Sequence, residues 1–192
     1  MLAKGHHFPN VTLVAVLDAD SGLFSPDFRS HERLGQLLTQ VAGRSGRGDV
    51  RGQVYIQTHQ PQHPLLEILT TKSYASFTKA IMAERDLFQL PPFRYMALVR
   101  AESERSGEAE MFLRTARQIA ESRVMPSKKL EYLGPLPAIM EKKAGRYRYT
   151  LQISANKRSL IQPLLTSLSL ALEKHRAARK VRWSIDVDPQ EL

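Results

Sequence analysis

The chain has 192 residues, a net charge of +9 and a hydrophobic content of 42%, which suits one large or two small domains with a packed core. It contains no cysteine, which excludes a disulfide framework and a thiolate metal site within it. No apolar run approaches the ~20 residues that span a bilayer and no signal-peptide pattern opens the chain, so we expect a cytoplasmic protein without a membrane anchor.

The first half of the chain is predicted to alternate strands with helices. Its first strand is a continuous apolar run with β-branched residues, which is typical of a strand buried on both faces of a parallel sheet. The expected elements are strands over 12–17 and 53–58 and helices over 33–41, 63–69 and 74–88. The apolar residues of the first helix recur at core-facing spacing; they are Leu34, Leu37, Leu38 and Val41. Prolines end the last helix, and we place a boundary near Phe93, giving predicted domains 1–93 and 94–192.

The second half is predicted to be a small α+β domain with the element order βαβββαβ. The expected strands cover 96–101, 130–133, 138–142, 146–153 and 181–187. A helix over 108–123 precedes a hairpin around residues 143–145, and a second helix buries Ile161, Leu164, Leu165, Leu168 and Leu172. Proline is tolerated without distortion only in the first turn of a helix. Because of Pro163, this helix is expected to start nearer Ser159 than Lys157, or to kink. In the last strand the apolar side chains are expected to point inward; they are Val181, Trp183, Ile185 and Val187.

The positive charge is concentrated in the second half. Residues 1–94 carry ten basic and eight acidic side chains, a net charge of +2, whereas residues 95–192 carry 18 and 11, a net charge of +7. A basic domain beside a nearly neutral one favours an anionic partner such as nucleic acid for the basic domain.

The segment over residues 40–47 has the pattern Gln-x-x-Gly-Arg-x-Gly-Arg. On a helix, Gln40, Arg44 and Arg47 would share one face, and the two glycines would let the backbone approach a ligand closely. Arginine binds phosphate bidentately and keeps its charge. The pattern therefore predicts phosphate binding; a basic, solvated helix end is the alternative.

This octapeptide resembles motif VI of superfamily 2 helicases. Upstream, Lys4-Gly5-His6-His7-Phe8-Pro9, an apolar strand and Asp18-Ala19-Asp20 are similar to helicase motif V and the strand behind it. The sequences at 1–11, 37–44, 90–93 and 181–189 closely resemble the PriA family of replication-restart helicases. The resemblance runs from end to end.

The resemblance implies the C-terminal portion of a RecA-like helicase lobe followed by a domain similar to ribosomal protein S10. It also implies that the chain is about the last quarter of an ATP-dependent 3′-to-5′ DNA helicase, opening in the middle of motif V. Such helicases recognise stalled or repaired forks and start primosome assembly. A nucleic-acid-binding module that acts alone, without an ATP role, is the alternative function.

Specific roles follow from the resemblance. Arg47 would be the arginine finger and Arg44 a second contact to the γ-phosphate of ATP. The residues implied in ATP binding and coupling are Gln40, Gly43, Gly46, Lys4 and Gly5, and His6 is implied in DNA contact. For residues 4–7 a charged surface loop is the alternative.

Two helicase motifs are missing from the sequence. It has no Gly-x-x-x-x-Gly-Lys-[Ser/Thr] loop and no Asp-Glu-x-His motif to hold Mg²⁺. ATP and Mg²⁺ are therefore implied only for the full-length protein, and we expect no ATP hydrolysis by this chain alone. The family's zinc module would likewise lie upstream.

Cations and tyrosines alternate at the predicted hairpin. The cations are Lys142, Lys143, Arg146 and Arg148, with Tyr147 and Tyr149 between them. Cations for phosphate and rings for base stacking suit forked or single-stranded DNA. In the alternative, the tyrosines lie in the core and the cations are solvated. A second basic stretch comprises Arg176, Arg179, Lys180 and Arg182.

No metal site is predicted. Asp186 and Asp188 share a strand face, but no third acid, histidine or catalytic lysine lies nearby in sequence. His6, His7, His59 and His63 have no zinc-site spacing.

The resemblance also implies partners. The acidic tail of single-stranded DNA-binding protein (SSB) would contact Arg158 and Gln162, which are four residues apart and can share a helical face. The primosome proteins PriB and DnaT are further implied partners, and a location at the bacterial nucleoid is implied.

Overall fold

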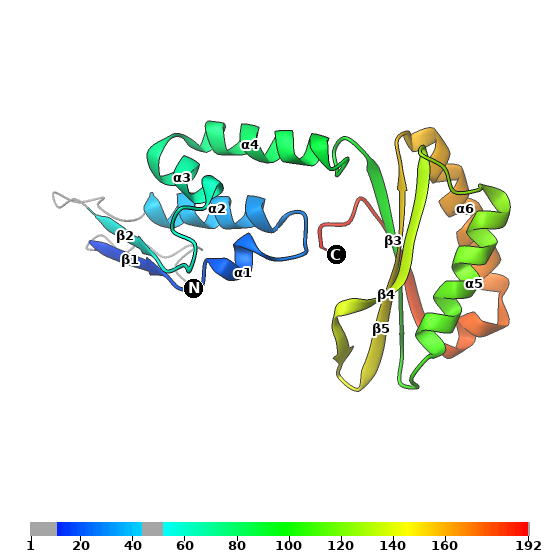
Figure 1. Ribbon diagram of the computed structural model, residues 1–192. Coiled ribbons are helices and arrows are strands. Elements are labelled where there is room, and N and C mark those ends of the chain that lie inside the picture. The colour runs from blue at the N-terminus through cyan, green and yellow to red at the C-terminus, as the bar shows by residue number, and fades with distance from the viewer. Residues whose placement is uncertain (1–10, 44–51, 192) are drawn as a thin grey trace. The chain divides into compact units, whose positions relative to one another are not determined.

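The computed structural model describes residues 11–43 and 52–191 (Figure 1). The chain divides into two compact units, Met1–Leu87 and Phe88–Leu192. Each unit mixes helices with its own sheet. No helix among the described residues is long and apolar enough to cross a membrane.

The first unit builds helices around a parallel strand pair. β1 (Leu13–Val16) pairs with β2 (Gln53–Ile56), with Val14 opposite Val54. The helices are α1 (Asp20–Leu23), α2 (Ser30–Ala42), α3 (Pro64–Thr71) and α4 (Tyr74–Leu87). One core cluster joins α1, α2 and α3 to the strands through Ala19, Leu23, Leu34, Leu38 and Leu66.

A glycine allows the close packing of α2 and α4. A Cβ atom on Gly35 would lie 2.1 Å from Cε1 of Phe77, which is fully buried. The two helices can therefore approach each other only because position 35 has no side chain.

Two expectations for the first unit were wrong in detail. β1 is not buried on both faces: Val14 is buried, but Leu13 is 56% exposed. Among the described residues the sheet has two strands, and the core cluster contacts only the face that carries Val16 and Ile56. Leu37 is also exposed, because the buried stripe of α2 follows Leu34, Leu38 and Val41 and leaves position 37 at its margin.

The second unit is a four-stranded antiparallel sheet with helices on one face (Figure 1). Its elements are β3 (Tyr95–Ser103), α5 (Glu108–Arg123), β4 (Leu130–Lys143), β5 (Arg146–Ala155), α6 (Arg158–Lys174), a 3-10 turn η1 (Arg176–Lys180) and β6 (Arg182–Val187). The sheet order is β4-β5-β3-β6. The order βαββαβ is that of the ferredoxin-like split βαβ arrangement.

The core of this unit lies between the sheet and its two helices. Strand residues Val99, Leu151 and Ile153 are fully buried with the helix residues Phe112 and Leu168. All five leucine and isoleucine positions expected to be buried in the second helix are buried. The periodicity of α6 was therefore predicted correctly.

The expected order βαβββαβ was wrong, because β4 is one long strand where two short ones were predicted. Its pairing with β5 shifts register between Leu133 and Leu136 and again between Pro137 and Lys142. Gly134 has a φ of +103°, and a Cβ there would lie 2.7 Å from the Thr150 carbonyl oxygen. The prolines of β4 therefore lie where the pairing with β5 is irregular. In the sequence, such a segment has the pattern of a loop.

The ends of the last two elements also differ from expectation. α6 begins at Arg158 with Lys157 as its N-cap, and Pro163 lies inside the helix rather than in its first turn. A start that places Pro163 in the first turn was therefore wrong, and a kink at Pro163 stays a prediction. In β6, Trp183 and Ile185 pack against the core, whereas Val187 is exposed at the strand end.

Candidate nucleic-acid interface

The phosphate-binding motif is only partly within the described residues. Gln40 is exposed near the end of α2, and Gly43 is the C-cap with a φ of −68°. Arg44, Gly46 and Arg47 lie outside the described residues, as do Lys4, Gly5 and His6. Their roles toward ATP and DNA therefore stay predictions.

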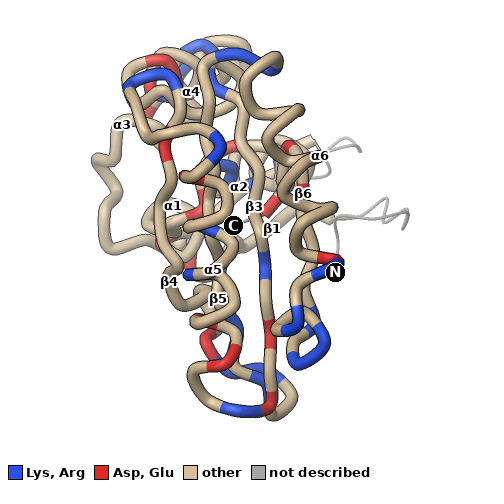
Figure 2. The backbone as a smooth tube through the Cα atoms, turned by 90° about the vertical axis from the view of Figure 1, so that its right-hand side faces the viewer, with Lys and Arg blue, Asp and Glu red and all other residues tan. Residues whose placement is uncertain are grey.

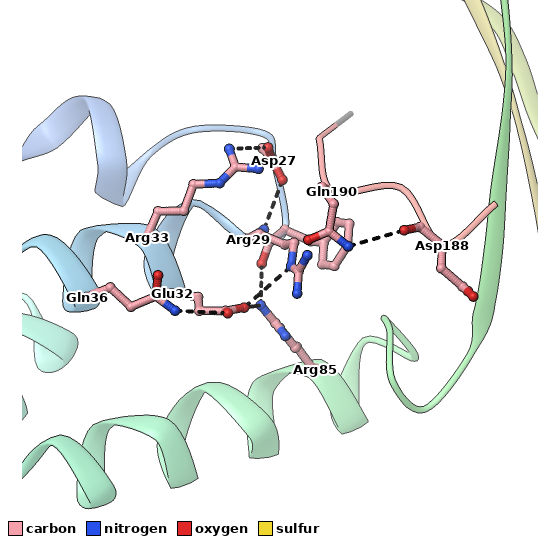
Figure 3. A network of polar contacts seen from close by, with 9 residues as sticks. Asp27, Arg29, Glu32, Arg33, Gln36, Arg85, Asp188 and Gln190 are labelled. Atoms are coloured by element: carbon pink, nitrogen blue, oxygen red, sulfur yellow. Dashed lines mark hydrogen bonds and ion pairs between the residues drawn. The ribbon is translucent and has the colours of Figure 1, made fainter. Parts of the chain in front are cut away.

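An ion-pair network fixes α2, which contains Gln40 at the start of this motif (Figure 3). Arg85 of α4 donates from Nη2 to Glu32 of α2 at 2.8 Å and to the Phe28 carbonyl oxygen at 3.3 Å. Burial tends to raise the pKa of Glu32, but the hydrogen bond from Arg85 and the charge of Arg29 hold it below its usual value. Nearby, Arg33 pairs with the buried Asp27 at 2.9 Å. These contacts hold α4, and the loop that precedes α2, against α2.

A carboxylate cluster joins the segments that follow β1 and β2. Asp20 accepts hydrogen bonds from the Thr58 hydroxyl at 2.5 Å, from the His59 backbone N–H at 3.0 Å and from His59 Nδ1 at 2.6 Å. The Thr58 bond, followed by the two from His59, lowers the pKa of Asp20 to about 2. This cluster could not be recognised in the sequence, because its members lie almost forty residues apart along the chain.

We expect the stabilisation from Asp20 to be lost in acid. Its pKa in the folded state lies below the ordinary value of 3.8 for an aspartate, so its contribution is present above pH 3.8 and disappears as the pH falls toward 2. Thermal unfolding of the wild type and Asp20→Asn between pH 7 and pH 2.5 measures it. The melting temperatures should differ at neutral pH and converge below pH 3; a constant difference would contradict the assignment.

The predicted hairpin exists, with a two-residue turn. Ala144 and Gly145 both have positive φ, as a type I′ turn requires, and Lys143 pairs with Arg146. Lys142 Nζ lies 4.7 Å from the centroid of the Tyr147 ring. Lys143 is exposed.

The alternating cations and tyrosines separate onto opposite faces of β5. Tyr149 pairs with Ala101 and packs against the core on the helix-covered face; its burial, followed by nearby Glu141 and Glu110, raises its pKa. Arg146 and Arg148 alternate with the tyrosines and so point to the opposite, open face. Arg146 contacts Glu104 at 2.6 Å and Glu102 at 4.0 Å.

The open face of this sheet is hollowed beside these arginines. A cavity of about 280 Å³ is lined by Arg100, Glu102, Arg148, Thr150, Arg182 and Ser184, among others. It gathers three guanidinium groups from three neighbouring strands. In the sequence, Arg148 and Arg182 belong to separate basic stretches. Arg100 and the hollow were not predicted, because strand register decides which residues meet.

Other basic residues are spread over helices, loops and strands (Figure 2). Arg176, Arg179 and Lys180 are exposed on η1. At the start of α6, Arg158 and Gln162 are both exposed. Arg158 Nη2 lies 3.7 Å from an Asp188 carboxylate oxygen.

Asp186 and Asp188 each face an arginine. Asp186 pairs with Arg100 at 3.2 Å, and Asp188 pairs with Arg158. Within residues 11–43 and 52–191, no group of three or more metal-ligating side chains is present.

Comparison with known proteins relates most of the second unit to a domain family. Residues 86–190 match the family described as "Primosomal protein N C-terminal domain". The chain is similar along its whole length to "Replication restart protein PriA" of Haemophilus influenzae, at 47% identity over 193 residues, which cover 100% of this chain and 26% of that protein. Proteins of the same name from Rickettsia conorii and Bacillus subtilis are each 38% identical, covering 99% and 98% of this chain and 28% and 23% of theirs.

The chain therefore belongs to the PriA family and corresponds to its C-terminal region. This confirms the resemblance drawn from the sequence. The chain spans about a quarter of the length of these curated relatives.

Proposed function

We propose that this chain is the C-terminal region of a DNA helicase that acts in replication restart. The observation that carries the proposal is the end-to-end similarity to proteins named for replication restart. The motif at residues 40–47 supports a contribution to ATP hydrolysis, with Arg44 and Arg47 facing the γ-phosphate and Gln40 coupling nucleotide to the lobe. In this proposal the first unit is part of a RecA-like lobe and the motor moves 3′ to 5′.

The second unit supplies DNA contacts. Its hairpin presents Lys142 and Lys143, and the open face of its sheet presents Arg148. Its net positive charge favours a polyanion. Forked and single-stranded DNA are the proposed ligands, with PriB and DnaT as further partners of the full-length protein.

The experiment that tests this function uses the 192-residue chain with fluorescently labelled fork and single-stranded DNA. We expect weak binding whose affinity falls steeply with salt, since counterions are released from phosphate. We expect no DNA-stimulated ATP turnover, because the sequence lacks a Walker A loop. Turnover that Arg47→Ala abolishes would refute the view that the ATP site is incomplete, and absence of DNA binding would refute the role of the second unit.

A finer proposal concerns the acidic tail of SSB. The first turn of α6 contains no acidic residue, and its N-cap makes no side-chain hydrogen bond. Its backbone N–H groups therefore add positive potential beside Arg158 and Gln162. A terminal carboxylate could accept hydrogen bonds from the guanidinium of Arg158 and from the amide of Gln162.

In the full-length protein we expect Arg158→Ala to weaken binding of a labelled SSB tail peptide by roughly tenfold, as loss of a charge-assisted hydrogen bond predicts. Arg176→Ala is the matched control, since Arg176 is an exposed cation beyond the other end of α6. A fluorescence titration gives both affinities. Unchanged peptide affinity for Arg158→Ala, with DNA binding intact, would remove Arg158 from the site.

A further inference from the structure

The open face of the second unit carries an ordered grid of charged and hydroxyl side chains. On β3, Glu102 lies between Arg148 of β5 and Arg182 of β6, since it is in register with both. Two residues along β3, Arg100 lies in the same way between Thr150 and Ser184. Even-numbered positions of β3 and β5 point away from the helices, because the odd-numbered ones fill the core.

The guanidinium groups of this grid differ in how they are engaged. Arg100 pairs with Asp186 at 3.2 Å and donates a hydrogen bond to the carbonyl oxygen of Glu191. Arg182 has a distant partner in Glu102, at 3.8 Å. Arg148 is half-buried in the wall of the hollow and has no ion pair or hydrogen bond with any other described residue.

The guanidinium of Arg148 is available to an anion. Its nitrogen atoms are not among the fully buried ones that lack a partner, and partial burial reduces the screening of its charge by solvent, which favours an anionic ligand. Arg148 lines a hollow of about 280 Å³, a volume that can take a phosphate group. An anion there would satisfy Arg148 and would gain a second guanidinium from Arg182.

Phosphate fits these donors well. The planar fork of arginine binds two phosphate oxygens at once, and the hydroxyls of Thr150 and Ser184 can add neutral hydrogen bonds. Tyr149 and Trp183 also line the hollow, but both pack against the core on the helix-covered face, so their rings are engaged there rather than presented for base stacking. The chemistry is that of backbone contact, which is independent of base sequence.

We propose that this hollow is a phosphate-binding subsite for single-stranded DNA, with Arg148 and Arg182 as the phosphate ligands. The subsite rests on the proposed DNA-binding role of the second unit and deepens it, since it places a contact on the sheet face as well as at the hairpin. Arg100 is a positioning residue, because Asp186 and Glu191 already engage its guanidinium. Glu102 lies between the two ligands and opposes the incoming phosphate.

The test measures binding of a labelled thymidine oligonucleotide to the full 192-residue chain by fluorescence anisotropy across a salt series. Arg148→Ala should weaken binding by about tenfold, as expected for loss of a charge-assisted hydrogen bond. It should also reduce the slope of log affinity against log salt by about 0.7, the value for one phosphate contact to a single strand. Arg148 has no ion-pair partner within the described part of the fold, so its removal breaks no ion pair there.

Glu102→Gln provides the opposite change. Removal of the negative charge between the two arginines should tighten oligonucleotide binding severalfold at low salt. Glu102 also contacts Arg146 of the hairpin at 4.0 Å, so the gain assigns the contact to the hollow only when Arg148→Ala, which leaves Arg146 in place, weakens binding.

Matched controls lie on the other side of the sheet. Arg114 and Glu110 pair on α5 at 2.5 Å, so Arg114→Ala and Glu110→Gln change the net charge of the chain by the same amounts. Both should bind the oligonucleotide within about twofold of the wild type, as expected when only overall charge changes at a distance. Equal effects from the α5 and open-face variants would mean that net charge alone acts, and would overturn the subsite.

The remaining outcomes separate the two proposals. Wild-type binding that Arg148→Ala and Glu102→Gln leave unchanged would overturn the subsite and keep the DNA-binding function. Absence of wild-type binding would overturn both. An aspartate-rich peptide provides the last comparison. If Arg148→Ala weakens binding of this peptide but not of the oligonucleotide, the hollow is assigned to an acidic protein segment instead.

Discussion

Replacement of Arg47 by alanine in the full-length protein is expected to lower ATP turnover by about 10³-fold or more. The expectation follows from the resemblance of residues 40–47 to helicase motif VI, in which this arginine would stabilise negative charge on the γ-phosphate in the transition state. Fork binding should survive, because the charge acts on the nucleotide. Steady-state ATP hydrolysis and fork affinity, measured on the same preparation, give both quantities.

Arg51→Ala is a suitable control for this experiment. Arg51 lies four residues beyond the motif, so its removal takes the same charge from the same segment. It should leave turnover within a fewfold of the wild type. Equal loss of fork binding and turnover in Arg47→Ala would show that Arg47 contacts DNA or supports the fold, and would contradict its role as an arginine finger.

Arg85→Ala is expected to destabilise the first unit by about 2–4 kcal/mol, a range typical of breaking a buried, hydrogen-bonded ion pair. The side chain of Arg85 is only 9% exposed and bridges α4 to Glu32 and to the Phe28 carbonyl oxygen. Its guanidinium also lies over the Phe28 ring, 5.4 Å from the centroid. Its loss leaves Glu32 without its nearest cation.

Two signals can follow this change in one denaturant titration. Trp183 is the only tryptophan in the chain and lies in the second unit, so its fluorescence reports that unit, whereas far-ultraviolet circular dichroism reports both. Arg85→Ala should shift part of the dichroism transition and leave the fluorescence transition in place. Arg85→Met keeps the apolar stem and should recover part of the loss. A fluorescence transition that shifts equally would contradict a local effect.

The elements that the sequence predicted best are those with a long hydrophobic period. α5 was expected over 108–123 and has those bounds, because sixteen residues give several repeats of one buried stripe. β4 was divided in two, since Pro135 and Pro137 look like a loop until the pairing with β5 is known. A strand that changes register offers no simple alternation to detect.

The candidate site could be predicted only in part, for a related reason. The basic residues of the hairpin stand close together in the sequence, so their chemistry was visible there. The contact of Asp20 with Thr58 and the meeting of Arg148, Arg100 and Arg182 depend on which strands become neighbours. Long-range register sets these contacts, and one sequence does not encode it in any local pattern.

The uncovered face of the β1–β2 pair has a practical consequence. Leu13 and Tyr55 lie on this face with 56% and 61% of their surface exposed, and neither strand has another strand partner among the described residues. Apolar surface next to open backbone donors and acceptors is a template for pairing between molecules. Concentrated samples of the whole chain should therefore self-associate through the first unit. A shorter fragment over residues 88–192, whose sheet has its helix layer and its own core, should stay monodisperse at higher concentration.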